Sequence, residues 1–178
     1  LALALLDIQA GENGEEKAAE FRKQLSEDYF ERLGGNDFFG VQTYSRMVVG
    51  PNGVIPPGAD VEKNQIGEEY YPEAIGGTVR HAAQVSGIPV IVTENGLSSE
   101  DDSRRLEYYQ RALSSAASAM QDGVDVRGYF AWSLMDNFER VSGYGSKFGI
   151  VAVDRETQKR TVKPSGQWLG QVARENQL

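Results

Sequence analysis

The residues best suited to chemistry in this sequence are carboxylates that follow apolar runs. Glu94 ends the run Ile88–Thr93, and Asn95-Gly96, which follow it, permit an abrupt turn. A carboxylate beside apolar walls loses part of its hydration, yet neighbouring hydrogen-bond donors can hold it ionised. Glu94 is therefore a candidate catalytic carboxylate. The alternative is a strand-end glutamate that caps the next helix.

A second apolar run also ends in an aromatic residue and then carboxylates. The stretch Gly128–Glu139 contains Trp132, Asp136 and Glu139. An aromatic face next to a carboxylate suits a sugar, because the C–H face of the ring stacks on tryptophan while hydroxyl groups donate to the carboxylate. The alternatives are that Trp132 packs in the core and that Glu139 is a solvated loop acid.

These segments belong to an alternating series of strands and helices. Such alternation predicts an α/β fold with parallel pairing, and in parallel αβ barrels the reacting side chains lie at the carboxyl ends of strands. Residues 1–178 contain no repeat or linker, so we expect one domain. The expected strands are Leu1–Ile8, Asp37–Thr43, Ile88–Thr93 and Val126–Ser133, and the expected helices are Glu15–Leu33, Pro72–Val85, Asp101–Gln121 and Pro164–Asn176. Longer loops are expected at about 44–70 and 134–163, with a small hairpin formed by Phe148–Asp154 and Arg160–Val162.

Composition excludes several classes of function. The net charge of −8 argues against nucleic acid and against an anionic membrane as partners. The absence of cysteine excludes disulfides and thiolate chemistry, and the single histidine, His81, is expected on a helix surface. No stretch approaches the ~20 apolar residues of a membrane span. We expect a cytoplasmic protein that needs no metal or other cofactor.

The first residues suggest an upstream portion. Leu1–Leu6 is apolar, but it lacks a basic region and continues into Asp7-Ile8-Gln9, so it does not have the pattern of a signal peptide. The sequence also starts at Leu1 in the middle of an expected strand. We therefore expect that a preceding segment is missing.

Several motifs together resemble glycoside hydrolase family 1, the retaining β-glucosidases and β-galactosidases. They are TENG at Thr93–Gly96, GYFAWSLMDNFE at Gly128–Glu139, Gly143-Tyr144 and KFGIVAVD at Lys147–Asp154. The resemblance implies a (β/α)8 TIM barrel, of which this chain would be the second half, strands 5–8 with their helices in a parallel sheet.

The resemblance also implies roles for individual residues. Glu94 would be the nucleophile, and Tyr44 would donate a hydrogen bond to it; otherwise Tyr44 is a plain loop aromatic. Gln42 stands where the family usually has asparagine. Trp132 would form a platform of the sugar subsite, and Glu139 would accept hydrogen bonds from sugar hydroxyls.

The sequence departs from the family at two tryptophan positions and at the acid/base. Arg140 and Glu68 replace the tryptophans, through drift or through altered specificity, and Arg140 could pair with Glu139. The Asn-Glu-Pro motif that carries the family's acid/base glutamate does not occur. Retaining hydrolysis needs a second carboxyl group ~5–5.5 Å from the nucleophile. Asp136 and Glu139 are the nearest candidates in sequence, but the family gives neither of them that role.

Two hypotheses follow for the chain. In the first it is part of a β-glycoside-hydrolysing enzyme and pairs with a complementary N-terminal half-barrel, or self-associates. In the second it is a non-catalytic truncated half-barrel that serves as a folding or interaction module. An open half-barrel has unpaired edges, and we expect it to expose apolar residues such as Val90, Val92 and Phe130.

Overall fold

The computed structural model describes residues 5–8, 35–50 and 53–178 of the chain. Within them the strands and helices alternate only in part, because two short hairpins are inserted. The elements are β1 (Leu5–Ile8), β2 (Phe39–Gln42), β3 (Arg46–Gly50), β4 (Gly53–Ile55), α2 (Ala74–Ser86), β5 (Val90–Asn95), α3 (Asp102–Gln121), β6 (Val126–Ala131), β7 (Val151–Val153), β8 (Arg160–Val162) and α4 (Pro164–Glu175).

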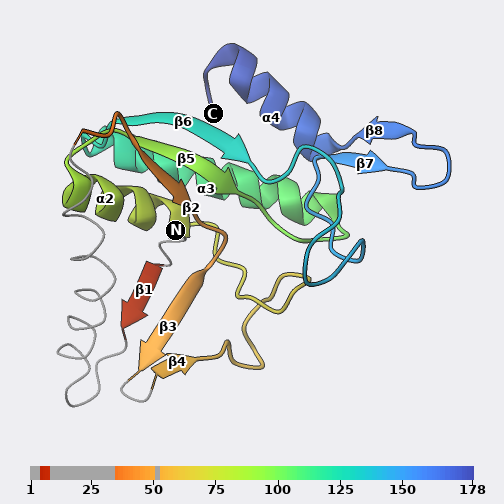
Figure 1. Cartoon of the computed structure of the whole chain (residues 1–178), viewed down its shortest axis with the longest axis horizontal. Helices are drawn as coiled ribbons and strands as arrows, with labels where there is room; N and C mark the ends of the chain where they lie inside the picture. Colours follow the sequence, from red (N-terminus) through yellow and green to blue (C-terminus); the bar gives the residue numbers. More distant parts are fainter. Residues whose placement is uncertain (1–4, 9–34, 51–52) are drawn as a thin grey trace.

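A parallel sheet of β2, β5 and β6 is the centre of the fold. β5 lies between the other two strands, and α2 and α3 cover one face of the sheet (Figure 1). β-Branched residues favour the pleated strands, and each crossover through a helix permits parallel pairing. The predicted strands at 37–43, 88–93 and 126–133 are confirmed within a few residues.

The hydrophobic core lies between this sheet and its helices. Alternate strand residues point toward the helices, which is the two-residue period of a strand. The core therefore joins sheet and helix residues that are far apart in sequence. It includes Phe39, Val41, Val90 and Val92 from the strands, Ile75, Val79 and Ala82 from α2, and Tyr108, Tyr109, Ala112 and Ala119 from α3.

The helices begin and end at the signals that the sequence provides. Asp101 caps α3, and its side chain accepts a 2.9 Å hydrogen bond from the backbone N–H of Ser103. α2 ends at Gly87, whose φ of 65° is in the left-handed region that glycine enters without a steric penalty. α4 starts at Pro164, where a missing N–H costs nothing.

The sequence did not predict the pairing of β1. This strand pairs in parallel with β3, with Leu5 opposite Arg46, and not with β2, which would be its neighbour in a regular barrel half. β3 and β4 form an antiparallel hairpin within the predicted loop 44–70. An apolar run predicts a strand but not its partner, and β3 offers an edge opposite the one that β4 occupies. The predicted helix Glu15–Leu33 lies outside the described residues.

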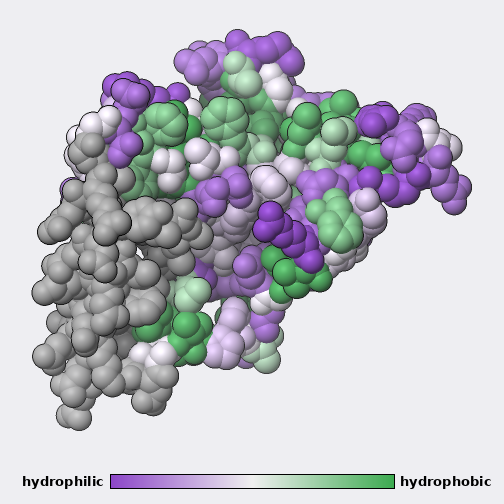
Figure 2. Space-filling model, viewed as in Figure 1, coloured by the Kyte–Doolittle hydropathy of each residue, from purple (hydrophilic) through white to green (hydrophobic). Residues whose placement is uncertain are grey.

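The expectation of exposed inner-face residues was right for one residue and wrong for two. Val90 and Val92 are fully buried, because they face α2 and α3. Phe130, on β6 at the edge of the sheet, is 62% exposed. Figure 2 shows hydrophobic residues along the upper side of the molecule, where Figure 1 draws β6.

The hairpin expected near the C-terminus is confirmed as β7 and β8, which pair antiparallel with Val151 opposite Val162. His81 lies in α2, as predicted, and is partly exposed. Among the described residues, no helix is both long enough and apolar enough to cross a membrane.

Candidate active site

Glu94 and Gln42 meet at the carboxyl ends of neighbouring strands. They are register partners across β5 and β2, and Nε2 of Gln42 donates a 2.8 Å hydrogen bond to Oε1 of Glu94. Register irregularities occur next to both residues, after Val41 and after Val92. Such bulges redirect side chains at the ends of strands. The fold thus brings together two residues that are 52 positions apart.

Tyr44 completes the hydrogen bonding of Glu94. Its hydroxyl donates a 2.5 Å hydrogen bond to Oε2, so each carboxylate oxygen has one donor. Burial raises the pKa of Tyr44 well above its usual range, and the hydrogen bond to Glu94 and the charges of Glu94 and Glu139 raise it further. Tyr44 therefore stays protonated and remains a donor at neutral pH. The interpretation of Tyr44 as a plain loop aromatic is wrong.

Asn95 is the buried residue that holds this end of β5 against α3. Its Nδ2 donates to the backbone oxygen of Thr43 at 2.5 Å and to the hydroxyl of Tyr108 at 2.9 Å, and its Oδ1 accepts from Tyr129 at 2.5 Å. The sequence indicated only a turn here, because a hydrogen-bonding role for Asn95 depends on tyrosines from other elements. Since Val92 and Asn95 both face α3, the irregularity between them directs Glu94 away from the helix.

Trp132 and Glu139 form a second pair near the end of β6. Nε1 of the indole donates a 3.3 Å hydrogen bond to Oε1 of Glu139, and both residues are partly buried. The backbone of Glu139 exchanges hydrogen bonds of 2.8 and 2.7 Å with Gly143, which closes a tight loop. Glu139 is therefore not a freely solvated loop acid. Trp132 is not part of the buried core.

Arg140 is exposed, and in the described part of the chain it makes no ion pair with Glu139. The expectation that it could neutralise Glu139 is not met. Glu68 is also exposed and accepts a 2.9 Å hydrogen bond from Nδ2 of Asn64. Glu68 lines a groove with Arg46 and Pro56, so both departures from the family's tryptophans lie at accessible positions.

Asp136 does not lie free for acid catalysis. It is 7% exposed, and both of its oxygens lie close to Nζ of Lys163, at 3.1 and 3.0 Å. With so little exposure and with both oxygens against Lys163, the carboxyl group is not accessible to the leaving oxygen of a substrate. This removes one of the two candidates that the sequence offered for the second carboxyl group.

Gln65 joins three loops around the site. Its Oε1 accepts from Ser98 and from the backbone N–H of Lys147, each at 3.0 Å. Its Nε2 donates to the backbone oxygen of Gly145 at 3.0 Å and to Glu100 at 3.2 Å. No local pattern in the sequence indicated a role for Gln65. Among the described residues, no cluster of three or more metal-ligating side chains occurs.

The fold, a parallel sheet covered by helices, is similar to the folds of β-glycosidases of known structure. The crystal structure of β-glycosidase BGL167 matches 99% of this chain with a TM-score of 0.88 and 51% sequence identity. A β-glucosidase from Thermotoga maritima in complex with glucoimidazole matches the whole chain with a TM-score of 0.86 and 29% identity.

Residues 10–178 match the sequence model of glycosyl hydrolase family 1, and the chain belongs to this family. Its fold is accordingly part of a TIM barrel. Curated relatives include β-glucosidase A of Thermotoga maritima, 38% identical over 80% of this chain, and the β-glucosidase of an Agrobacterium species, 37% identical over 77%. The chain covers 35% and 34% of these two relatives, and 42% of β-glycosidase BGL167.

Proposed function

We propose that this chain supplies the nucleophile-bearing, second half of a retaining β-glycosidase barrel, strands 5–8. The observation that carries the proposal is the pair of hydrogen bonds from Gln42 and Tyr44 to the two oxygens of Glu94. The two donors orient the carboxylate at the carboxyl end of a central parallel strand, where barrel enzymes place reacting groups. The names of the two curated relatives given above, both β-glucosidases, support a β-glycoside substrate.

In the proposed reaction, one carboxylate oxygen of Glu94 attacks the anomeric carbon of the sugar. The bond to the leaving oxygen breaks as an acid protonates that oxygen, and a covalent glycosyl-enzyme forms. Water then attacks the same carbon, gives up a proton to the conjugate base and releases Glu94. Glu139 keeps one oxygen free of the indole and can accept sugar hydroxyls, while Trp132 offers its ring for stacking.

We infer that the acid/base comes from polypeptide outside these 178 residues, since they contain no Asn-Glu-Pro, Asp136 is paired with Lys163, and Glu139 is hydrogen-bonded to Trp132 at the proposed sugar subsite. We propose that a complementary half-barrel supplies it, joined to this chain or bound to it; a second copy of the chain can close the sheet but brings no such motif. The edge strand β6 and its exposed Phe130 support such a contact, because an open apolar edge favours strand addition. No observation on the described residues favours a purely non-catalytic module.

The test combines this chain with the part of Thermotoga maritima β-glucosidase A that it does not cover. The assembled protein is treated with a 2-deoxy-2-fluoro-β-glucoside that carries an activated leaving group, and its peptides are analysed by mass spectrometry. We expect one fluoroglucosyl adduct, on Glu94. Glu94→Gln should lose the adduct, whereas Glu156→Gln, an exposed carboxylate far along the chain, should keep it. An adduct on another carboxylate of this chain would contradict the proposal.

A further inference from the structure

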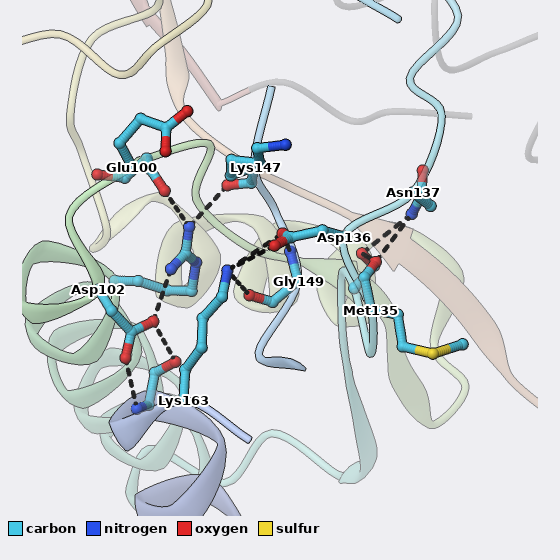
Figure 3. Close-up of polar contacts among 12 residues, drawn as sticks. Glu100, Asp102, Met135, Asp136, Asn137, Lys147, Gly149 and Lys163 are labelled. Atoms are coloured by element: carbon cyan, nitrogen blue, oxygen red, sulfur yellow. Dashed lines mark hydrogen bonds and ion pairs between the residues drawn. The ribbon is translucent and has the colours of Figure 1, made fainter. Parts of the chain in front are cut away.

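A buried ion pair links the loop after β6 to the start of α4. Asp136 is 7% exposed, and its Oδ2 lies 3.0 Å from Nζ of Lys163. The same Nζ donates to the backbone oxygen of Gly149 at 2.7 Å, while the N–H of Gly149 donates to Oδ1 of Asp136 at 2.9 Å (Figure 3). The three residues thus form a closed ring of polar contacts.

The atoms packed around this ring leave no space for a side chain at Gly149. A Cβ atom at this position would overlap the backbone of Met135 and Asp136, so only glycine lets the two segments approach this closely. Removal from water lowers the pKa of Lys163, and the nearby charge of Arg105 lowers it further, while Asp136 acts in the opposite direction. The ammonium group in this buried position therefore depends on Asp136 for compensation.

Asp136 occupies a particular place in the chain, between Trp132 and Glu139, whose side chains are hydrogen-bonded to each other. The backbone of this segment is held at Asp136 as well. Its N–H donates to the oxygen of Val151 at 3.0 Å, and its carbonyl oxygen accepts from Nη2 of Arg155 at 2.6 Å. Asp136 is thus anchored to β7, to Arg155 and to Lys163, whereas within the described residues Asn137, which follows it, contacts only Ser133 and Met135 of the same segment.

We propose that Asp136 and Lys163 are positioning residues that set where Glu139 and the Trp132 ring meet the sugar. The inference rests on the proposed function, because it assigns these two side chains to the sugar site. Without the ion pair, the segment between Trp132 and Glu139 loses its side-chain link to α4. A displacement of about 1 Å at a substrate-positioning group is sufficient to reduce catalysis strongly.

The test follows the indole N–H of Trp132 in the ¹⁵N-labelled chain by NMR. The chain has two tryptophans, and the peak that Trp132→Phe removes belongs to Trp132. Glu139→Ala gives the position of this peak when its acceptor is lost. We expect Asp136→Asn, and separately Lys163→Met, to move or broaden the Trp132 peak toward that position and to leave the Trp168 peak in place. Lys163→Arg, which keeps the charge, should restore most of the native position.

Asp125→Asn is the matched control, since its exposed pair with Arg127 lies away from the site, and it should change neither peak. If Asp136→Asn does not fold, Lys163→Met decides the question. If either variant lowers the midpoint of thermal unfolding but leaves the Trp132 peak unchanged, the pair is only structural and the proposal is wrong.

A second readout uses the assembled barrel described above. We expect Asp136→Asn to lower kcat/KM for an aryl β-glucoside by about 10–100-fold, the loss typical of one displaced hydrogen bond to a charged group. Labelling of Glu94 in the unmutated assembly tests the proposed function separately. An assembly without labelling would overturn that function, whereas the NMR result on the single chain would still decide whether the ion pair positions Glu139.

Discussion

The backbone carbonyl of Trp132 lies against Gly96 so closely that no side-chain carbon fits between them. The contact joins the residue after the end of β5 to the residue after the end of β6, and the N–H of Trp132 also donates a 2.8 Å hydrogen bond to the oxygen of Asn95. The positions of Glu94 and of the Trp132 ring are therefore coupled through these two backbone contacts.

Gly96→Ala should consequently destabilise the chain. The added Cβ must displace Trp132, and an overpacked site costs about 1–3 kcal/mol of unfolding free energy. Urea unfolding measures the loss. Gly58→Ala is the control, since the nearest atom to its new Cβ would be 3.8 Å away on Val61. Equal stability of the two variants would show that the Trp132 backbone moves without cost.

Tyr44→Phe should weaken catalysis in the assembled barrel while leaving the fold intact. The change removes the 2.5 Å donor to Oε2 of Glu94. A hydrogen bond to a charged group contributes about 1.5–3 kcal/mol, so we expect a 10–100-fold slower reaction with the fluoroglucoside inactivator. Tyr71→Phe, in which the ring that packs under Arg46 is kept, should react at the native rate. An unchanged rate in Tyr44→Phe would remove Tyr44 from the site.

The 178-residue chain alone should not hydrolyse cellobiose. Without an acid, the leaving oxygen of cellobiose would have to depart unprotonated. General acid catalysis typically accelerates such a reaction by ~10²–10⁴-fold. An activated aryl glucoside, whose leaving group needs no proton, is expected to react slowly at most. Release of glucose from cellobiose measures the first point. Robust turnover that disappears in Glu94→Gln would mean that Glu139 has taken the role of the acid, because Asp136 is held by Lys163.

Asp102 should stabilise the chain in a pH-dependent way. Burial opposes its ionisation, but hydrogen bonds from the N–H and hydroxyl of Ser165, at 2.9 and 2.7 Å, and the pair with Arg105 lower its pKa below the usual range. A depressed folded-state pKa gives stability above the unfolded value of about 3.9, and this stability is lost as pH falls toward the lower folded value.

We therefore expect Asp102→Asn to cost about 1.5–3 kcal/mol of unfolding free energy at pH 7, as for other hydrogen-bonded charges. The difference from the native chain should shrink below about pH 3.9. Urea unfolding at pH 7 and pH 3 measures both values, and the exposed Asp60→Asn serves as the control. If Asp102→Asn lowers the unfolding free energy equally at pH 7 and at pH 3, the charge of Asp102 does not account for its stabilising effect.

The sequence predicted the elements of the central sheet and its helices because each carries its own periodic pattern and end signals. Asp101 before α3, Gly87 after α2 and Pro164 at the start of α4 are local signals of this kind. The pairing of β1 with β3 is a relation between distant segments, which no local pattern contains. The hairpin of β3 and β4 was missed, although Met47-Val48-Val49 before Pro51-Asn52-Gly53 has the apolar run and turn residues of a hairpin.

The difference between local patterns and contacts of distant segments also applies to the candidate active site. Glu94 and Trp132 stand at the ends of recognisable strands, so the sequence marks them as candidates, and the structure brings Gln42 and Tyr44 to Glu94. Gln65 has no local signal, because its side-chain contacts are with residues 33 or more positions away. Polar residues whose role depends on tertiary contacts are hidden from reasoning on a single sequence.

The four hydrogen bonds of the Gln65 side chain determine which loops open together. They span the loops before α2, after β5 and after β6, so none of these loops can separate without breaking bonds to the others. Loops linked in this way form one cooperative opening unit. The backbone amides of Gln65, Ser99 and Lys147 would then exchange with deuterium at similar rates. Gln65→Ala removes the acceptor of the Lys147 N–H and would speed the exchange of Lys147 relative to Ser99, whose N–H still donates to the backbone oxygen of Lys147.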